Sequence, residues 1–329
     1  METLDIGRDG GVRAEVLPRG ATVHRLLVPT ATGPRNVVLG HPSPDDYGAD
    51  HGYLGATVGR YANRIRGASF ELEGTRHALG ANQAGNTLHG GPVGFDSRDW
   101  TVVAHEADSL TLALVSEDGD QGFPGRLEAS VTYTVTGDAL EMELRATTDA
   151  PTVVNLTHHG YVNLDGEGAG SVDGHRLTVH ADHYQPTDAD LVPVGEPAAV
   201  DGTPFDLRQA RTVADVVRRS HPDLLAARGV DHHYVVGGEG FREMAVVETT
   251  DLALHVSSDA PGVQVYTGNF LDGTVPGTGG GVYRQGDGLA LEPQASPDTP
   301  NRPEHPDYPL VVLRPGQTYT RRIRWSFTS

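Results

Sequence analysis

The sequence predicts an all-β protein built from antiparallel sheets, as a sandwich or a barrel, with few helices. Three observations support this: apolar and polar residues alternate along many short runs, turn residues separate these runs at intervals of about ten positions, and helical periodicity is rare. The 42 glycines and 22 prolines lie between the runs and are not gathered in one linker. We therefore expect residues 1–329 to form a single domain.

The clearest pattern predicts a β-hairpin. Apolar and polar residues alternate from Leu127 to Val135 and again from Leu140 to Leu144, with Gly137 between the two runs. A period of two on both sides of a glycine-containing turn is typical of an antiparallel hairpin with one solvated face. Similar runs predict further strands at residues 70–72, 110–115, 177–179, 244–247, 252–256, 263–266 and 323–327.

Helix signals are few, and the best one covers Gln209–Arg219. Its apolar residues recur at helical spacing on one face, and His221-Pro222 follows as a stop signal. The residues of that face are Ala210, Val213, Ala214 and Val217.

Composition limits the function classes. The chain has 25 basic and 44 acidic residues, a formal net charge of −19, so nucleic acid and anionic membrane surfaces are poor partners, whereas neutral sugars are not repelled. Without cysteine there are no disulfides, thiolate metal sites or cysteine nucleophiles. The N-terminus lacks the features of a signal peptide, and no run approaches the roughly 18 apolar residues of a membrane helix, so we expect a cytoplasmic protein.

Four polar segments interrupt the alternation, and the first two lie in the N-terminal third. In residues 55–65, Arg60, Asn63 and Arg64 could form a fork of donors for sugar hydroxyls. From the residues alone, solvated arginines on a surface turn are the simpler explanation, because arginine is mostly exposed. In residues 86–96, His89 precedes two glycines, which let the backbone take unusual angles and a ligand approach closely; an ordinary glycine turn is the alternative.

The other two segments contain candidates for proton transfer. His158 and His159 are adjacent, so in a strand they point to opposite faces and at most one reaches a given site, which argues against a metal pair. Glu292 lies on a predicted strand that ends at Pro293, on the face opposite Leu291, and could act as a general base. A charge on an edge strand, where proline is tolerated, explains the same pattern.

Together and in this order, the four segments resemble the aldose 1-epimerase (galactose mutarotase) family. Residues 119–125 and 265–272 agree as well, and the resemblance runs from about Gly40 to the C-terminus. It implies a large antiparallel β-sandwich, the supersandwich, and an isomerase that interconverts the α and β anomers of free aldohexoses such as galactose and glucose. It implies no cofactor and no metal, and a free sugar as the small-molecule partner. A monomer and a homodimer are both compatible with the sequence.

Carried over by residue, the resemblance makes Glu292 the general base and His159 the general acid. His159 lies two residues before Tyr161, as the His-x-Tyr pattern of the family requires. The sequence departs from the family at His158, where asparagine is usual, and at Gly160, where serine is usual. The residues that this resemblance assigns to sugar binding are Asn63, Arg64, His89, Asp231 and Gln264.

A carboxylate and an imidazolium suffice to open and close a sugar ring, and we expect their mutual attraction to favour both charged forms. One alternative is an epimerase-like protein for another or a phosphorylated aldose, for which Arg60, Arg64 and Arg66 are the only basic cluster. A second is a non-catalytic carbohydrate-binding β-sandwich. Such a protein would be expected to expose aromatic platforms, yet aromatic residues make up 6% of the chain, and Trp100 and Trp325 lie in predicted strands.

Overall fold

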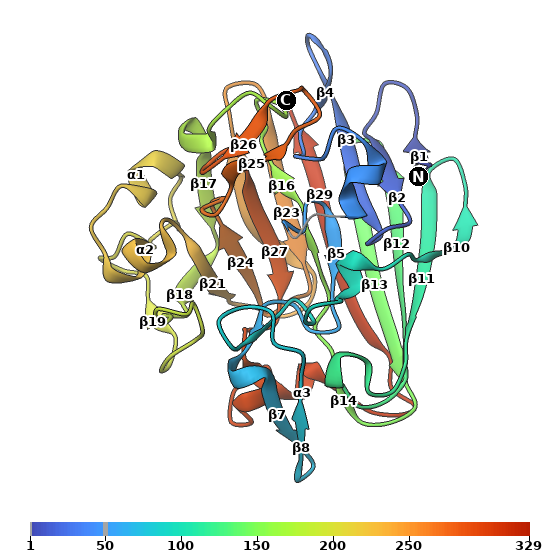
Figure 1. Ribbon diagram of the computed structural model, residues 1–329. Helices are drawn as coiled ribbons and strands as arrows, with labels where there is room; N and C mark the ends of the chain where they lie inside the picture. The colour runs from blue at the N-terminus through green and yellow to red at the C-terminus, as the bar shows by residue number, and fades with distance from the viewer. Residues whose placement is uncertain (1, 49–51) are drawn as a thin grey trace.

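A computed structural model describes residues 2–48 and 52–329, and most of its ordered segments are strands (Figure 1). Among these residues there are three short α-helices, α1 (Val213–Val217), α2 (Pro222–Ala227) and α3 (Tyr308–Val311). No helix in this part of the chain is long and apolar enough to span a membrane. The all-β prediction with few helices is confirmed.

The largest sheet within the described residues has nine antiparallel strands. The predicted hairpin is confirmed as β12 and β13, which pair from Leu127 opposite Thr148 to Thr136 opposite Ala139. The other predicted runs also fall in strands of the molecule, except that Leu252 lies just before the strand that contains residues 253–256. In spatial order the sheet consists of β10 (Thr101–His105), β11 (Ser109–Ser116), β12 (Leu127–Thr136), β13 (Ala139–Thr148), β29 (Tyr319–Thr328), β23 (Ala253–Ser258), β22 (Arg242–Glu248), β17 (Arg176–Val179) and β20 (Arg211–Thr212).

A six-stranded sheet packs against the inner face of the nine-stranded one. Val263 and Leu291 from this sheet share one buried apolar cluster with Leu254 and Trp325 from the larger sheet, so the two sheets enclose the core. This is the sandwich that the alternation predicted. In spatial order the sheet consists of β16 (Tyr161–Val162), β27 (Leu289–Gln294), β24 (Gly262–Tyr266), β21 (Asp231–Val236), β18 (Ala181–Tyr184) and β19 (Ala198–Ala199).

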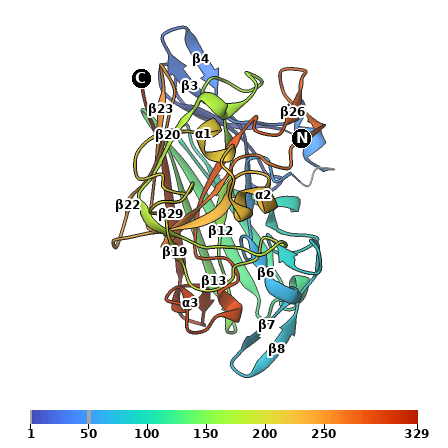
Figure 2. The same cartoon turned by 90° about the vertical axis from the view of Figure 1, so that its left-hand side faces the viewer.

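Smaller sheets pack around the two large ones, and α1 and α2 lie on one flank, which faces the viewer in Figure 2. The hairpin of β7 (Ser69–Leu72) and β8 (Thr75–Ala78) projects at the lower end in Figure 1. A four-stranded sheet contains β1 (Leu4–Gly7), β2 (Arg13–Leu17), β3 (Thr22–Thr30) and β4 (Gly33–Asn36). The two-stranded pairs are β5 (Ala56–Val58) with β15 (Thr157–His159), β6 (Arg64–Ile65) with β9 (Thr87–Leu88), β7 (Ser69–Leu72) with β8 (Thr75–Ala78), β14 (Thr152–Val153) with β28 (Val312–Leu313), and β25 (Asp272–Pro276) with β26 (Val282–Arg284).

The helix predicted over Gln209–Arg219 is shorter than expected, since the residues before α1 belong to β20. Thr212 is the N-cap of α1, where its side chain accepts a hydrogen bond from the backbone N–H of Asp215. The helix buries Val216, which was not on the predicted face. Pro222 does not merely end this helical segment. It begins α2, because proline suits the first turn of a helix.

Candidate active site

A pocket of about 530 Å³ opens on the face of the six-stranded sheet that is turned away from the core. Because side chains alternate along a strand, the residues between the core positions of β21, β24 and β27 all point to this face. Six of the seven site residues predicted from the sequence line the pocket: Asn63, Arg64, His89, His159, Asp231 and Glu292. The seventh, Gln264, lies directly behind the wall and donates a hydrogen bond from Nε2 to Oδ1 of Asp231 at 2.7 Å.

Glu292 lies in the interior of the six-stranded sheet, between β16 and β24. The alternative that it is an edge-strand charge is therefore wrong, although the predicted face is correct. Its side chain is 2% exposed, and its Oε2 has no hydrogen-bond partner among the described residues. A buried carboxylate oxygen without a partner is costly, so such a group is a strong candidate for contact with a ligand.

The surroundings of Glu292 raise the pKa of its carboxyl group well above the usual value of 4.5. Burial is the largest cause, and the negative charge of Asp231 adds to it. The positive charge of Arg64 acts in the opposite direction. Attraction to His159, which we expected to favour the charged form, is therefore not the main influence on this carboxyl group.

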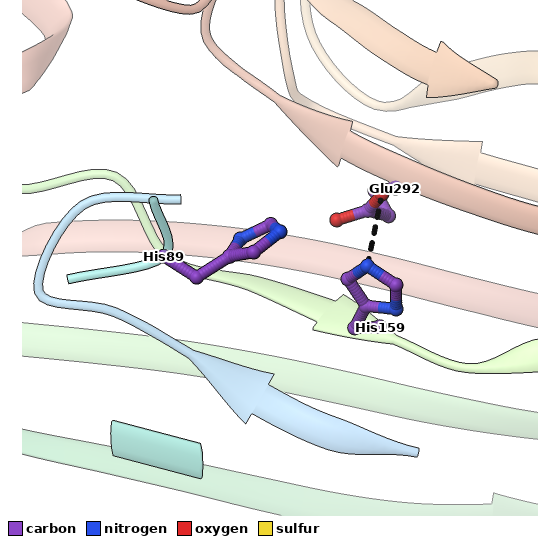
Figure 3. Close-up of side chains that lie close together, drawn as sticks. All are labelled: His89, His159 and Glu292. Carbon is purple, nitrogen blue, oxygen red and sulfur yellow. Dashed lines mark ion pairs between the residues drawn. The ribbon is translucent and has the colours of Figure 1, made fainter. Parts of the chain in front are cut away.

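His159 extends from β15 toward Glu292, and its Nε2 lies 3.6 Å from Oε1 of that residue (Figure 3). His158 points to the opposite face of the strand, as predicted, and packs edge-on against Trp325 with ring centroids 5.2 Å apart. Burial lowers the pKa of His158 to about 3, so this ring is neutral at physiological pH. Only one of the adjacent histidines reaches the pocket.

His89 is held by the backbone of Asn63. The N–H of Asn63 donates to Nδ1 of His89 at 3.1 Å, and the N–H of His89 donates back to the carbonyl of Asn63 at 3.1 Å. Since Nδ1 accepts, the neutral ring carries its proton on Nε2 and is a hydrogen-bond donor there. Burial, His159 and Arg64 all lower the pKa of His89, which favours this neutral form.

The glycines after His89 are required by the close approach of two backbone segments. Gly90 has φ of 91°, and a Cβ atom at this position would lie 2.0 Å from the carbonyl oxygen of Gly59. His89 itself has φ of 50°, a conformation that non-glycine residues seldom adopt. The turn that these glycines permit places His89 in the pocket.

The geometry of His89, His159 and Glu292 also bears on metal binding. One potential ligand atom from each residue lies within 4.8 Å of the other two. A metal requires a lone pair on the nitrogen that faces it, yet the hydrogen bond from Asn63 leaves the proton of neutral His89 on Nε2. The group is therefore arranged to exchange protons and hydrogen bonds and does not fit a three-ligand metal site.

The two arginines of residues 55–65 have different surroundings, and neither is solvated as the alternative supposed. Arg60 is 2% exposed, and its guanidinium donates to the backbone carbonyls of residues 116, 117, 124 and 125, so it fixes a loop and does not reach the pocket. Arg64 does line the pocket, with Nη2 3.8 Å from Oδ2 of Asp231. Arg66 is engaged by Asp188 at 2.8 Å.

Sequence reasoning missed several residues of the pocket wall. Four aromatic side chains line it despite the low aromatic content: Tyr53, Tyr161, Tyr266 and Phe270. Phe270 is 47% exposed, so an aromatic surface is present where composition suggested none. Tyr161, Tyr266 and Phe270 lie in segments that carry the resemblance and could have been found there. Tyr53 and Gln83 come from irregular loops, where no periodicity indicates the direction of a side chain.

Comparison with known proteins agrees with this geometry. The family described as aldose 1-epimerase matches residues 2–326, which extends the resemblance almost to the N-terminus. The chain is 40% identical to an aldose 1-epimerase of Escherichia coli over 98% of this chain and 94% of the relative. It is 37% identical to the human galactose mutarotase over 96% of this chain and 91% of the relative.

Solved structures show the same architecture. A crystal structure of an aldose epimerase homologue from C. elegans superimposes with a TM-score of 0.92 at 31% identity. The superposition covers 99% of this chain and 98% of the homologue's chain. That of a galactose 1-epimerase from Lactobacillus acidophilus gives a TM-score of 0.86 at 28% identity, with 98% and 93% covered. The fold is thus a galactose mutarotase-like antiparallel β-sandwich.

Proposed function

The chain belongs to the aldose 1-epimerase family, and on this basis we propose that Glu292 is the general base and His159 the general acid of its reaction. As a member of this family it is an isomerase that interconverts the α and β anomers of aldoses. The observation that carries the assignment is the separation of 3.6 Å between Nε2 of His159 and Oε1 of Glu292. The anomeric oxygen and the ring oxygen of a sugar are bonded to the same carbon, so a base and an acid that act on them must end in neighbouring positions.

The reaction needs two proton transfers in each direction. Glu292 removes the proton of the anomeric hydroxyl while His159 donates a proton to the ring oxygen, and the C1–O5 bond breaks to give an open-chain aldehyde. Rotation about the C1–C2 bond presents the other face of the aldehyde. The C5 hydroxyl then attacks C1, protonated Glu292 returns its proton to the carbonyl oxygen, and His159 takes back the proton of the C5 hydroxyl.

The separation of roles between the two histidines follows from their hydrogen bonds. His89 is neutral and carries its proton on Nε2, so it is a hydrogen-bond donor to the sugar and not the strong acid. Asn63, Arg64 and Asp231 line the same pocket and hold the sugar hydroxyls, and Gln264 supports Asp231 from behind. None of these steps requires electron transfer or a leaving group, which is why acid–base groups suffice.

We propose free aldohexoses, galactose and glucose, as the substrates. The name of the human relative includes galactose, and the pocket is lined by polar groups that suit neutral hydroxyls. A phosphorylated substrate has less support, because Arg60 and Arg66 are engaged elsewhere and Arg64 is the only arginine among the described residues that line the pocket. A pure binding module would not need a buried carboxylate beside a histidine.

Polarimetry tests this function directly. Freshly dissolved α-D-galactose and α-D-glucose relax to their equilibrium rotation in buffer alone, and the protein is expected to accelerate this relaxation without changing the final value. Glu292→Gln and His159→Asn should each remove nearly all of the acceleration while the circular dichroism spectrum stays unchanged. Relaxation at the buffer rate for both sugars would reject the proposed function, and full activity in either variant would reject the assigned roles.

The remaining expectations stay proposals. We propose that residues 1–329 form one domain, supported by a single apolar cluster that draws residues from Ile6 to Phe327. A cytoplasmic location and a monomeric or homodimeric state are proposed as well, since a free sugar substrate and the acidic composition are compatible with both.

A further inference from the structure

Arg64 is held in the pocket by a residue outside the set assigned so far. Its Nε donates to Oε1 of Gln83 at 2.6 Å, while its Nη2 lies on the side of Asp231, 3.8 Å from Oδ2. The side chain of Arg64 is only 5% exposed, so its direction depends on these few contacts. Gln83 is half-buried and lines the same pocket, between Asn82 and Leu88.

The loop that carries Gln83 is fixed on both sides of it. Gln83 and Asn86 exchange backbone hydrogen bonds across a tight turn, and both central residues, Ala84 and Gly85, have positive φ, as in a type I′ turn. Asn82 donates to the carbonyl of Leu88 at 3.0 Å and accepts from its N–H at 2.7 Å. The acceptor is therefore presented to Arg64 by a rigid segment, and not by a mobile side chain on a free loop.

The choice of an amide matters because of the charges that face Glu292. That carboxyl group is faced by Asp231 from β21, Arg64 from β6, His89 from the turn after β9, His159 from β15 and Tyr266 from β24. Arg64 is the permanently positive group among them. A carboxylate bound to its Nε would neutralise it, whereas a glutamine orients the guanidinium and leaves its charge intact.

We propose that Gln83 is a positioning residue that orients Arg64 with a neutral acceptor, so that the guanidinium keeps its full charge for Asp231, Glu292 and the sugar hydroxyls. This inference rests on the proposed function of the pocket. It predicts two separable effects: loss of the acceptor weakens sugar binding, and addition of a negative charge at the same place changes the ionisation of Glu292.

Two variants of nearly equal size separate these effects. Gln83→Met removes the acceptor, and we expect KM for galactose to rise about tenfold, the loss of one hydrogen bond to a charged group, with kcat changed less than about threefold. Gln83→Glu keeps an acceptor but adds a charge. Here we expect KM within about threefold of the wild type and an acidic limb of kcat/KM displaced to higher pH, because Arg64 no longer favours ionised Glu292.

A double-variant comparison tests whether Gln83 acts through Arg64. A lysine side chain lacks the guanidinium Nε–H that donates to Gln83. In an Arg64→Lys background, Gln83→Met should therefore change KM by less than about twofold. Gln317→Met is the matched control, since Gln317 is an exposed glutamine that accepts from the N–H of Arg314 outside the pocket. It should leave KM, kcat and the pH profile unchanged.

The results that overturn the inference are distinct from failure of the proposed function. Any one of three results would refute the role of Gln83 while the wild type and Gln317→Met remain active. These results are a KM within twofold of the wild type for Gln83→Met, an unmoved acidic limb of the pH profile for Gln83→Glu, and additive effects of Gln83→Met and Arg64→Lys. A wild-type protein that accelerates no mutarotation would instead remove the proposed function itself. Thermal unfolding of each variant, expected at the wild-type temperature, confirms that the fold is intact.

Discussion

The opposing charges around Glu292 give the most informative prediction. Asp231 raises the pKa of this carboxyl group and Arg64 lowers it, so Asp231→Asn and Arg64→Met should move that pKa in opposite directions. An ionised base is needed for catalysis, and activity is therefore lost as the pH falls below its pKa. The acidic limb of the pH profile should move to lower pH in Asp231→Asn and to higher pH in Arg64→Met.

The size of the displacement follows from the sheet. Asp231 lies on β21 and Glu292 on β27, with only β24 between them. Adjacent strands are about 4.8 Å apart, so the two carboxylates are on the order of 10 Å from each other. At an effective dielectric constant of about 20 their repulsion is about 1.7 kcal/mol, or about one pKa unit. We expect the limb in Asp231→Asn to move down by about one pH unit.

The assay is polarimetry at sugar concentrations well below KM, where the rate reports kcat/KM and thus the ionisation of the free enzyme. Buffer-catalysed mutarotation is subtracted at each pH. Asp272→Asn is the control, because Asp272 is an exposed carboxylate at the rim of the same pocket, where solvent screens its charge. Limbs that move in the same direction in Asp231→Asn and Arg64→Met, or that stay in place in both, would refute the electrostatic reasoning.

Three further predictions concern stability and its relation to the site. Because the pKa of Glu292 is raised in the folded state, its contribution to stability is present at low pH and is lost as the pH rises through that pKa. Glu292→Gln should lower activity by at least about 100-fold and yet raise the thermal midpoint of unfolding at pH 7, with no such gain near pH 4. A lower midpoint at pH 7 would contradict this prediction. Gly160→Ser adds a Cβ atom that clashes with the ring of Trp325 and lies 2.8 Å from Nε2 of His158, so urea unfolding should show a loss of about 1–3 kcal/mol. His158→Asn removes the second of these contacts and should restore part of the loss in the double variant; an undiminished loss there would show that the two positions are not coupled. Arg60→Met removes a buried cation from several backbone carbonyls and should lower the free energy of unfolding, measured with urea, by about 3 kcal/mol or more. Arg64→Met should mainly raise KM. The reverse pattern would contradict the roles that the structure gives the two arginines.

The sequence was sufficient to predict most of the strands tested and the face on which a strand side chain lies, because alternation is a local property. Along residues 289–292 the period of two alone predicts Glu292 on the face opposite Leu291, and the structure agrees. The same period carries no information about neighbours in the sheet. Whether the strand lies at an edge depends on β16 and β24, which come from residues more than twenty positions away in sequence, and so the edge explanation could not be rejected.

The irregular segments limited the prediction of the site. Arg60 and Arg64 are four residues apart in a stretch without periodicity, and their opposite roles depend on carbonyl groups near residues 116–125 and on Asp231. Gln83 gives a similar lesson, because a type I′ turn at Ala84 and Gly85 fixes its direction. Such information is tertiary, so it becomes visible only when the loop and the sheet are seen together.

The alternation that builds the core also sets the cost of the site. On β21, β24 and β27 most residues turned inward are apolar and lie in the core between the two sheets, which places Asp231, Gln264 and Glu292 together on the other face. Covering that face with loops excludes water, and this raises the pKa of Glu292 and makes its charged form unfavourable. The same exclusion strengthens the pull of the carboxylate on a sugar hydroxyl, since a base with a raised pKa accepts a proton more readily. The destabilising burial of Glu292 and its expected catalytic power therefore have one physical origin. A variant that removes the cost of burying the carboxylate should also lose activity.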